Sequence, residues 1–358
     1  MRRNYEKLGA AQGFSLVELM VALVIGMLIM AAVMAVMVNN NRNYITTDSM
    51  ARLQENARFA MEFITKDLRR AGYLGCSDDI DTINSTLNGG GFGGGGVAVQ
   101  PLEGINNYTG SSVWSPSTNT PSLNDPATGS DAVAIRYIDL NNPVTIVKEM
   151  PSTAARLFVN PGHGLQEGDI IMVSDCDSAD MMQITSVVPG TGAESGKDGI
   201  NHNAGSGHLP GNSTQKLSKI YGEDAVILKF GSFAYYIRQD PVSGTRSLYR
   251  TTLDGPEELV EGIETMQILY GLVSTGDRIP TVYKTADQVG GVSEWRNVIS
   301  LRMAFVAGTI ANTRDGQLTT DTPTDTGNYD VNGFTYNPAD ERRIRKVFTS
   351  TIMLRNIK

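Results

Sequence analysis

The stretch "GFSLVELMVALVIGMLIMAAVMAVMV", Gly13–Val38, decides the fold of the N-terminal part of the chain. From Leu19 to Val38 every residue is apolar apart from the small Gly26, and the run has the roughly 20 residues that an α-helix needs to cross a bilayer. One carboxylate, Glu18, stands at the front of this run. The stretch therefore predicts a membrane-spanning helix that begins beside an acidic side chain.

The charges on the two sides of the run predict its orientation. Arg2, Arg3 and Lys7 precede it, whereas its far side opens with "NNNRN" and a single arginine. Because positive charge is retained on the cytoplasmic side, we expect the N-terminus in the cytoplasm and the segment after Val38 in the periplasm or outside the cell. The alternatives are a buried helix of a globular protein and a cleaved secretory signal, with "AAVMA" as its cleavage site.

The basic leader and the start of the apolar run resemble a known signal. A short leader, Gly13, Phe14 and a hydrophobic helix with Glu18 at its fifth position are similar to the class III signal of type IV pilins and of type II secretion pseudopilins. This resemblance implies that residues 1–13 are a prepilin leader, which a prepilin peptidase removes between Gly13 and Phe14. It also implies N-methylation of the new terminus at Phe14 and pairing of Glu18 with the amino terminus of a neighbouring subunit.

Four later stretches resemble PilW-type minor pilins. They are "LRRAGYLGC" (68–76), "GDIIMVSDCDSADMMQIT" (168–185), "LVEGIETMQILYG" (259–271) and "VFTSTIMLRN" (347–356). The resemblance implies an α+β, pilin-like fold, in which a long N-terminal helix packs on an antiparallel β-sheet head with long irregular loops.

Helical periodicity continues beyond the apolar run. Residues 39–72 predict an amphipathic continuation of the helix with one buried stripe, because apolar residues recur at steps of three and four. The stripe consists of Leu53, Ala57, Ala60, Ile64, Leu68 and Ala71. Gly72 is the expected end of the helix. A single helix over residues 14–71 would be roughly 85 Å long at 1.5 Å per residue, and a break at "NNNRN" is the alternative. We expect residues 14–38 to lie in the membrane or the filament core.

The remaining residues, 73–358, predict a β-rich globular head. Residues 88–130 and 189–211 are rich in Gly and Ser and are expected to form flexible loops. Alternating and β-branched runs elsewhere predict strands, with turns at Gly231 and at residues 240–245. The run "EELVEGIETM", 257–266, is expected to form a short helix. A long helix followed by antiparallel strands is an α+β arrangement, so the pattern and the resemblance agree.

Only two cysteines occur, Cys76 and Cys176, and both follow the apolar run. The predicted orientation places them in an oxidising compartment, which favours a disulfide between them, whereas two separate thiols would be expected in the cytosol. The disulfide would tie the end of the long helix to the head.

The sequence gives little support for catalysis. It contains no nucleotide-binding, metalloprotease or hydrolase motif, so we expect no enzyme activity and no cofactor. The three histidines all lie in glycine-rich loops: His163, His202 and His208. The formal net charge of -8 disfavours nucleic acid as a partner.

Two acidic clusters offer an alternative, in which the head binds Ca²⁺. A disulfide would bring them within reach of each other, and carboxylates that converge can hold Ca²⁺. The residues concerned are Asp78, Asp79, Asp81, Asp175, Asp177 and Asp180. Their spacing is not that of an EF-hand, and a solvated acidic surface is the simpler interpretation.

These expectations point to a structural protein. The resemblance implies a minor pilin that takes part in type IV pilus assembly and primes or caps the filament by non-covalent packing. Its expected partners are other minor pilins, the major pilin, the prepilin peptidase, the inner-membrane assembly platform and a tip adhesin. It is expected in the inner membrane of a Gram-negative bacterium, with a periplasmic head, and then in the pilus, at its tip. The alternatives are a J-type pseudopilin of type II secretion, a competence pseudopilus subunit, and a membrane-tethered enzyme or binding module.

Overall fold

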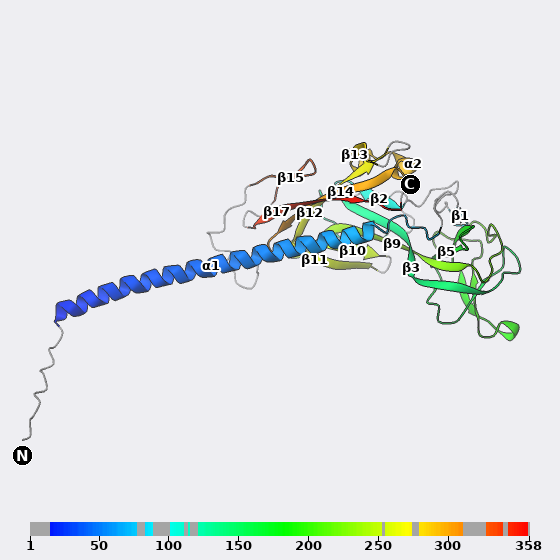
Figure 1. Ribbon diagram of the computed structural model, residues 1–358, viewed down its shortest axis with the longest axis horizontal. Helices are drawn as coiled ribbons and strands as arrows, with labels where there is room; N and C mark the ends of the chain where they lie inside the picture. Colours follow the sequence, from blue (N-terminus) through cyan, green and yellow to red (C-terminus); the bar gives the residue numbers. More distant parts are fainter. Residues whose placement is uncertain are drawn as a thin grey trace, which may run out of the picture. The chain divides into compact units, whose positions relative to one another are not determined.

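The computed structural model describes residues 15–76, 83–88, 101–110, 114, 121–252, 255–273, 279–310, 327–338 and 343–356. Its contacts divide the chain into two compact units, Met1–Arg52 and Leu53–Lys358. Helix α1, Leu16–Leu68, contributes residues to both units (Figure 1). The fold is α+β, with one long N-terminal helix and a head rich in antiparallel strands, as the sequence predicts.

In the first unit, α1 exposes all of its side chains from Leu16 to Asp48. The helix is continuous through residues 39–43, so the break considered at "NNNRN" does not occur. Within the described residues, α1 is the one helix whose length and composition suffice to cross a membrane.

The larger of two main sheets forms most of the second unit. Its central strands follow the order β1-β6-β5-β9-β3-β4-β8-β7, with β2 paired to β3, and β10 paired to β9 and to β11. Only β1 and β6 pair in parallel among these strands. The bounds are β1 Ile83–Ser85, β2 Leu102–Ile105, β3 Ala132–Lys148, β4 Leu157–Val159, β5 Ile170–Ser174, β6 Ala179–Gln183, β7 Ser186–Pro189, β8 Asp198–Asn201, β9 Val226–Gln239, β10 Arg246–Thr252 and β11 Gly255–Glu261.

A second, four-stranded antiparallel sheet has the order β13-β12-β14-β17. Its strands are β12 Ile263–Leu272, β13 Val282–Lys284, β14 Val298–Gly308 and β17 Arg345–Met353. The remaining elements are the hairpin of β15 Tyr329–Val331 and β16 Phe334–Tyr336, the short helix α2 Gly291–Trp295, and the single turns η2 Gly192–Glu194 and η3 Ala286–Gln288.

The second half of α1 packs its predicted stripe into the core of the head. All six residues of the stripe are buried, and they share one hydrophobic cluster with side chains of β9, β10, β12 and β14. Three of the six are alanines: Ala57 and Ala60 within the helix, and Ala71 just beyond its end. The small side chains of Ala57 and Ala60 let the helix backbone approach the sheet closely. The helix ends at Leu68, four residues before the predicted end at Gly72. Gly72 lies in the turn that follows, with φ +68, and donates its N–H to the Arg136 carbonyl at 3.1 Å. The prediction of an amphipathic helix packed on a sheet is therefore confirmed.

Both segments assigned to flexible loops contain strands, β2 within 88–130 and β8 within 189–211. Trp114 is buried against Ala132, Ala134 and Ala234, whose small side chains leave room for the indole ring. The described part of the first segment thus covers one face of β3 and β9. Residues 89–100, 111–113 and 115–120 of that segment lie outside the described residues.

Two local predictions are wrong. The expected helix at 257–266 is instead formed by β11 and β12, whose pairing with β10 and β14 outweighs the helix propensity of the Glu-rich run. The expected turn at Gly231 is absent, because β9 runs straight through it. A Cβ on Gly231 would lie 2.6 Å from Cζ of Tyr137, so this glycine makes room for the tyrosine ring. The turn predicted at 240–245 does join β9 to β10.

Candidate functional site

The first turn of α1 holds Glu18 in a reciprocal hydrogen-bond pair with Ser15. The backbone N–H and the hydroxyl of Ser15 donate to Oε2 of Glu18 at 3.0 and 3.1 Å, and the N–H of Glu18 donates to Oγ of Ser15 at 3.2 Å. This is a capping box, which satisfies N–H groups that a helix start leaves without intrahelical partners. Glu18 therefore has a local structural role in addition to its charge.

The rest of the processing site falls outside the structure. Gly13 and Phe14 lie outside the described residues, so the cleavage, the methylation and the pairing of Glu18 with a neighbouring terminus stay predictions. Within the described residues, both hydrogen bonds to the exposed Glu18 carboxylate go to its Oε2. Sequence reasoning missed Ser15, although the S-x-x-E pattern ahead of an apolar run was a readable signal.

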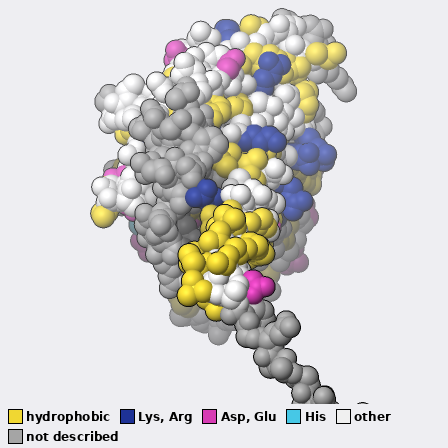
Figure 2. All heavy atoms as spheres, turned by 90° about the vertical axis from the view of Figure 1, so that its left-hand side faces the viewer, with side chains coloured by type: hydrophobic (Ala, Val, Ile, Leu, Met, Phe, Trp, Pro, Cys, Tyr) yellow, Lys and Arg dark blue, Asp and Glu magenta, His cyan; other side chains and the backbone are white. Residues whose placement is uncertain are grey.

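Beyond this turn, α1 presents apolar side chains around its whole circumference up to Val38. Figure 2 shows hydrophobic side chains gathered over the end of α1 that faces the viewer. A contiguous exposed apolar surface of this kind marks a site for lipid or for other apolar helices. The geometry of the first unit therefore suits a membrane and a helical bundle equally.

The two cysteines form the disulfide Cys76–Cys176. Cys76 follows the turn that ends α1, and Cys176 lies in the turn between β5 and β6 with φ +70. Beside the disulfide, Gly75 packs against Leu228 and Met172, where a Cβ would lie 3.4 and 3.7 Å from their side chains. The covalent bond thus ties the chain leaving α1 to the β5–β6 turn of the large sheet.

A polar contact also joins α1 to the head. The hydroxyl of Tyr235 donates to Oδ2 of the buried Asp67 at 2.7 Å, and Nη1 of Arg250 lies 3.5 Å from the same oxygen. Burial and the adjacent carboxylate of Asp67 raise the pKa of the Tyr235 phenol, which keeps its proton available for the hydrogen bond. At the helix end, Nδ2 of Asn356 donates to the Arg69 carbonyl at 2.9 Å.

The acidic clusters are only partly described. Asp175 forms an ion pair with Lys219. The buried Asp180 accepts hydrogen bonds from Ser218 and from the Tyr221 hydroxyl, the latter at 2.6 Å. Asp177 is exposed. The other predicted ligands, Asp78, Asp79 and Asp81, lie outside the described residues. Two of the six carboxylates are therefore already engaged by protein groups.

The three histidines have different surroundings. His163 Nε2 is 3.5 Å from Asp198, and His208 Nε2 is 2.9 Å from Glu167. His202 is buried, and this burial lowers the pKa of its imidazole. In the described part of the chain, no group of three or more His, Cys, Asp or Glu side chains is placed to hold a metal ion.

Comparison with protein families gives two matches. Residues 234–356 match the family model of the Type IV Pilus-assembly protein W, PilW, and residues 9–34 match that of the prokaryotic N-terminal methylation motif. The resemblance to PilW-type minor pilins is confirmed. The PilW match covers the C-terminal third of the chain, from within β9 to the end of β17, and the methylation motif contains Gly13, Phe14 and Glu18. Comparisons with curated proteins and with solved structures gave no match.

The two matches support a role as a pilin in type IV pilus assembly that interacts with other pilus components. They also suggest a structural protein rather than an enzyme. The methylation motif and the exposed apolar half of α1 fit a membrane-anchored pilin. Of the four PilW-like stretches, 259–271 and 347–356 fall inside the PilW match, and these stretches form most of β12 and β17.

Proposed function

We propose that the chain is a minor pilin that primes or caps a type IV pilus by packing non-covalently with other minor pilins. The observation that supports this most directly is the combination of the PilW match with an apolar helix that is exposed throughout Leu16–Val38. Because the apolar side chains have no partner within the described chain, the hydrophobic effect drives their burial in lipid. Van der Waals packing between helices then favours their transfer into a bundle with other pilin helices.

The proposed life cycle has two stages. The chain is first held in the inner membrane of a Gram-negative bacterium, with Arg2, Arg3 and Lys7 in the cytoplasm and the head in the periplasm. Prepilin peptidase removes residues 1–13, and the amine of Phe14 is methylated. The assembly platform then transfers the subunit to the filament, where Glu18 pairs with the amino terminus of a neighbouring minor or major pilin.

A position at the pilus tip is supported by the size of the head. The segment 73–358 is far larger than its helical stem, and a head of this size at every subunit would crowd a thin fibre. At the tip it has free space on one side. There the head contacts the neighbouring minor pilins and is placed to contact a tip adhesin.

Mass spectrometry of sheared pili and of membranes tests this proposal. We expect a methylated Phe14 terminus in both fractions and minor pilins among the co-purifying proteins. An intact leader in assembled filaments contradicts the proposal, because the amine that Glu18 is proposed to meet would not exist.

A deletion strain distinguishes the alternative, a J-type pseudopilin of a type II secretion system. Loss of pili and of twitching motility is expected for the pilus subunit, whereas exoproteins trapped in the periplasm are expected for the pseudopilin. Loss of DNA uptake alone would indicate a competence pseudopilus. The same class III signal serves all three systems, so the phenotype decides among them.

A further inference from the structure

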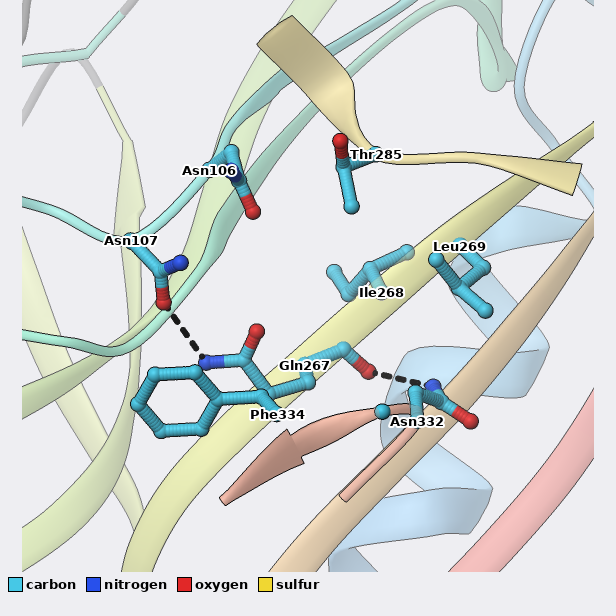
Figure 3. A pocket seen from close by; sticks show the side chains of 9 residues that line it. Asn106, Asn107, Gln267, Ile268, Leu269, Thr285, Asn332 and Phe334 are labelled. Atoms are coloured by element: carbon cyan, nitrogen blue, oxygen red, sulfur yellow. Dashed lines mark hydrogen bonds between the residues drawn. The ribbon is translucent and has the colours of Figure 1, made fainter. Parts of the chain in front are cut away.

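A small pocket opens in the head where four segments from distant parts of the sequence meet. Its volume is about 170 Å³, and it is lined by the chain just after β2, by β12, by the residue before η3 and by the turn of the β15–β16 hairpin. Figure 3 shows the carboxamides of Asn106, Asn107 and Gln267 turned toward the space between them, with Ile268 across from them. The pocket belongs wholly to the second unit.

Neutral polar groups dominate the lining. None of the nine lining residues carries a charge, and four of them have carboxamide side chains: Asn106, Asn107, Gln267 and Asn332. Oδ1 of Asn106 is buried and has no hydrogen-bond partner. Because this atom has almost no surface that water can touch, a ligand reaches it only when the half-buried Asn106 side chain turns further toward the pocket. Pairing it then recovers the roughly 1–3 kcal/mol that an unpaired buried acceptor costs.

The other carboxamides are fixed by hydrogen bonds that leave one polar atom of each toward the pocket. Nε2 of Gln267 donates to Oδ1 of Asn107 at 3.1 Å and to the Gly129 carbonyl at 2.8 Å, which turns Oε1 of Gln267 toward the space. The same bond holds Asn107 with its Nδ2 free among the described residues. Because both amides are held before any ligand arrives, little conformational entropy is lost on binding.

The backbone beneath the pocket is equally well braced. The N–H of Asn107 donates to Oδ1 of Asp131 at 2.9 Å, and Nδ2 of Asn332 donates to the carbonyls of Gln267 and Arg302, both at 3.0 Å. Asn107, Asn332 and Gly333 all have positive φ, which directs the two turns toward β12. Asn and Gly adopt this conformation readily, and Asn332-Gly333 is the favoured composition of a two-residue hairpin turn, so these turns hold the lining in place without backbone strain.

We propose that this pocket binds one ring of a neutral sugar. A hydroxyl group both donates and accepts, so neighbouring hydroxyls of a sugar satisfy the acceptors Oδ1 of Asn106 and Oε1 of Gln267 and the donor Nδ2 of Asn107 together. The half-buried ring of Phe334 and the side chain of Ile268 offer apolar surface to the C–H face of the sugar. The absence of charge from the lining disfavours phosphate, carboxylate and ammonium ligands.

The size of the space limits the ligand to a single unit. Water takes up about 30 Å³ per molecule in the liquid, so the pocket holds the volume of a few waters or of one pyranose ring. The proposal uses residues of the head only and does not depend on the role of α1 in assembly.

Saturation-transfer difference NMR on the detergent-solubilised full chain tests the proposal. The probes are D-galactose, D-glucose, D-mannose, L-fucose, N-acetylglucosamine and N-acetylgalactosamine, each at millimolar concentration. We expect transfer to at least one of these sugars. Absence of transfer to all six overturns the proposal.

Two variants and a matched control locate the binding. Asn106→Leu replaces the carboxamide by an apolar group of similar size, and we expect it to weaken binding at least tenfold while leaving the midpoint of unfolding unchanged or raised. Phe334→Ala is expected to weaken binding as well. Thr335→Ala, on the exposed opposite side of β16 and outside the pocket lining, is expected to bind as the wild type does. Wild-type affinity in Asn106→Leu overturns the assignment of the sugar to this pocket.

Discussion

Two properties of the Glu18 side chain can be separated by substitution: its hydrogen bonds with Ser15 and its negative charge. Glu18→Gln keeps a side chain that completes a capping box but removes the charge. Ser15→Ala removes the cap, at a cost of about 1 kcal/mol, and keeps the charge. If the charge carries assembly, Glu18→Gln should reduce the amount of this subunit in sheared pili at least tenfold, and Ser15→Ala should leave it near the wild-type level.

Immunoblots of sheared pili, normalised to the membrane fraction, provide the measurement. Both variants are expected to be inserted and cleaved, so leader removal serves as the internal control. Equal losses in the two variants would contradict pairing by charge and would assign Glu18 to the helix start alone.

Asp131 links the two sheets through its carboxylate. Its Oδ1 accepts the N–H of Asn107 at 2.9 Å and its Oδ2 accepts the N–H of Ile268 at 2.7 Å. Burial raises the pKa of Asp131 to about 7, against the opposing effect of these two hydrogen bonds. Between about pH 4 and 7 the folded chain therefore holds a proton on Asp131 that the unfolded chain has released. The contribution of Asp131 to the free energy of unfolding is full below about pH 4 and is lost as the pH rises to 7.

Replacing Asp131 tests this pH dependence. Between pH 5 and 8 the free energy of unfolding of the wild type should fall by an amount on the order of 1–4 kcal/mol, and Asp131→Asn should flatten that slope. Denaturant unfolding at several pH values provides the measurement. Asp240→Asn is the control. Hydrogen bonds from turn N–H groups lower the pKa of Asp240, so its titration changes stability only below pH 5 and should leave the slope between pH 5 and 8 unchanged. A slope unchanged in Asp131→Asn refutes the assignment.

At the scale of elements, a buried ion pair crosses β14. Nε of Arg345 on β17 donates to Oε2 of Glu264 on β12 at 2.7 Å, and both side chains are almost fully buried. Gly308, at the end of β14, pairs with Arg345. A Cβ on Gly308 would lie 2.3 Å from Oε1 of Glu264. Because glycine has no Cβ, the Glu264 carboxylate can occupy this space.

Gly308→Ala should therefore destabilise the four-stranded sheet. Displacing Glu264 breaks a buried ion pair, which costs about 3–5 kcal/mol. Denaturant unfolding of the full chain measures the loss. Gly207→Ala is the matched control, because an added Cβ meets nothing within 4 Å there, and such a change is expected to stay within about 0.5 kcal/mol. A loss below 1 kcal/mol in Gly308→Ala would show that the carboxylate moves aside at little cost.

The elements differ in how far the sequence could predict them. The stripe from Leu53 to Ala71 was readable because one long helix repeats its spacing many times. Residues 257–266 were not, because Glu-rich propensity is local, whereas the pairing of β11 and β12 with β10 and β14 involves partners distant in sequence. The burial of Trp114 could not be predicted for a related reason. It depends on Ala132, Ala134 and Ala234, which come together only in the folded sheet.

The candidate sites divide in the same way. Glu18 and the two cysteines stand out in the sequence by composition alone, and the Cys76–Cys176 bond is present in the structure. The pocket around Asn106 and Gln267 could not be predicted from the sequence. Its residues come from four separate segments, and none of these segments carries a recognisable motif. Its unpaired acceptor becomes visible only when burial is known.

At the scale of the whole molecule, the junction between α1 and the head is held in three ways. The apolar stripe supplies the buried area, the Asp67–Tyr235 hydrogen bond fixes the helix on β9, and the Cys76–Cys176 disulfide fixes the chain beyond its end. The stripe and the hydrogen bond can break and re-form under load, whereas the disulfide cannot. The disulfide is therefore the restraint that remains at this junction when the non-covalent contacts open.

Removing the disulfide should lower the stability of the head substantially. The bond joins residues 100 apart in sequence, and closing a loop of this length is worth about 4.7 kcal/mol in a chain-entropy treatment. Cys76→Ser, Cys176→Ser and the double variant should lose similar amounts of unfolding free energy, because each removes the same bond. Reductant should lower the wild type to their level and leave Cys76→Ser unchanged. Hydrogen exchange should quicken first in residues 53–68 of α1, which lose their nearest covalent restraint. Full retention of stability in the reduced wild type would assign the junction to the apolar stripe alone.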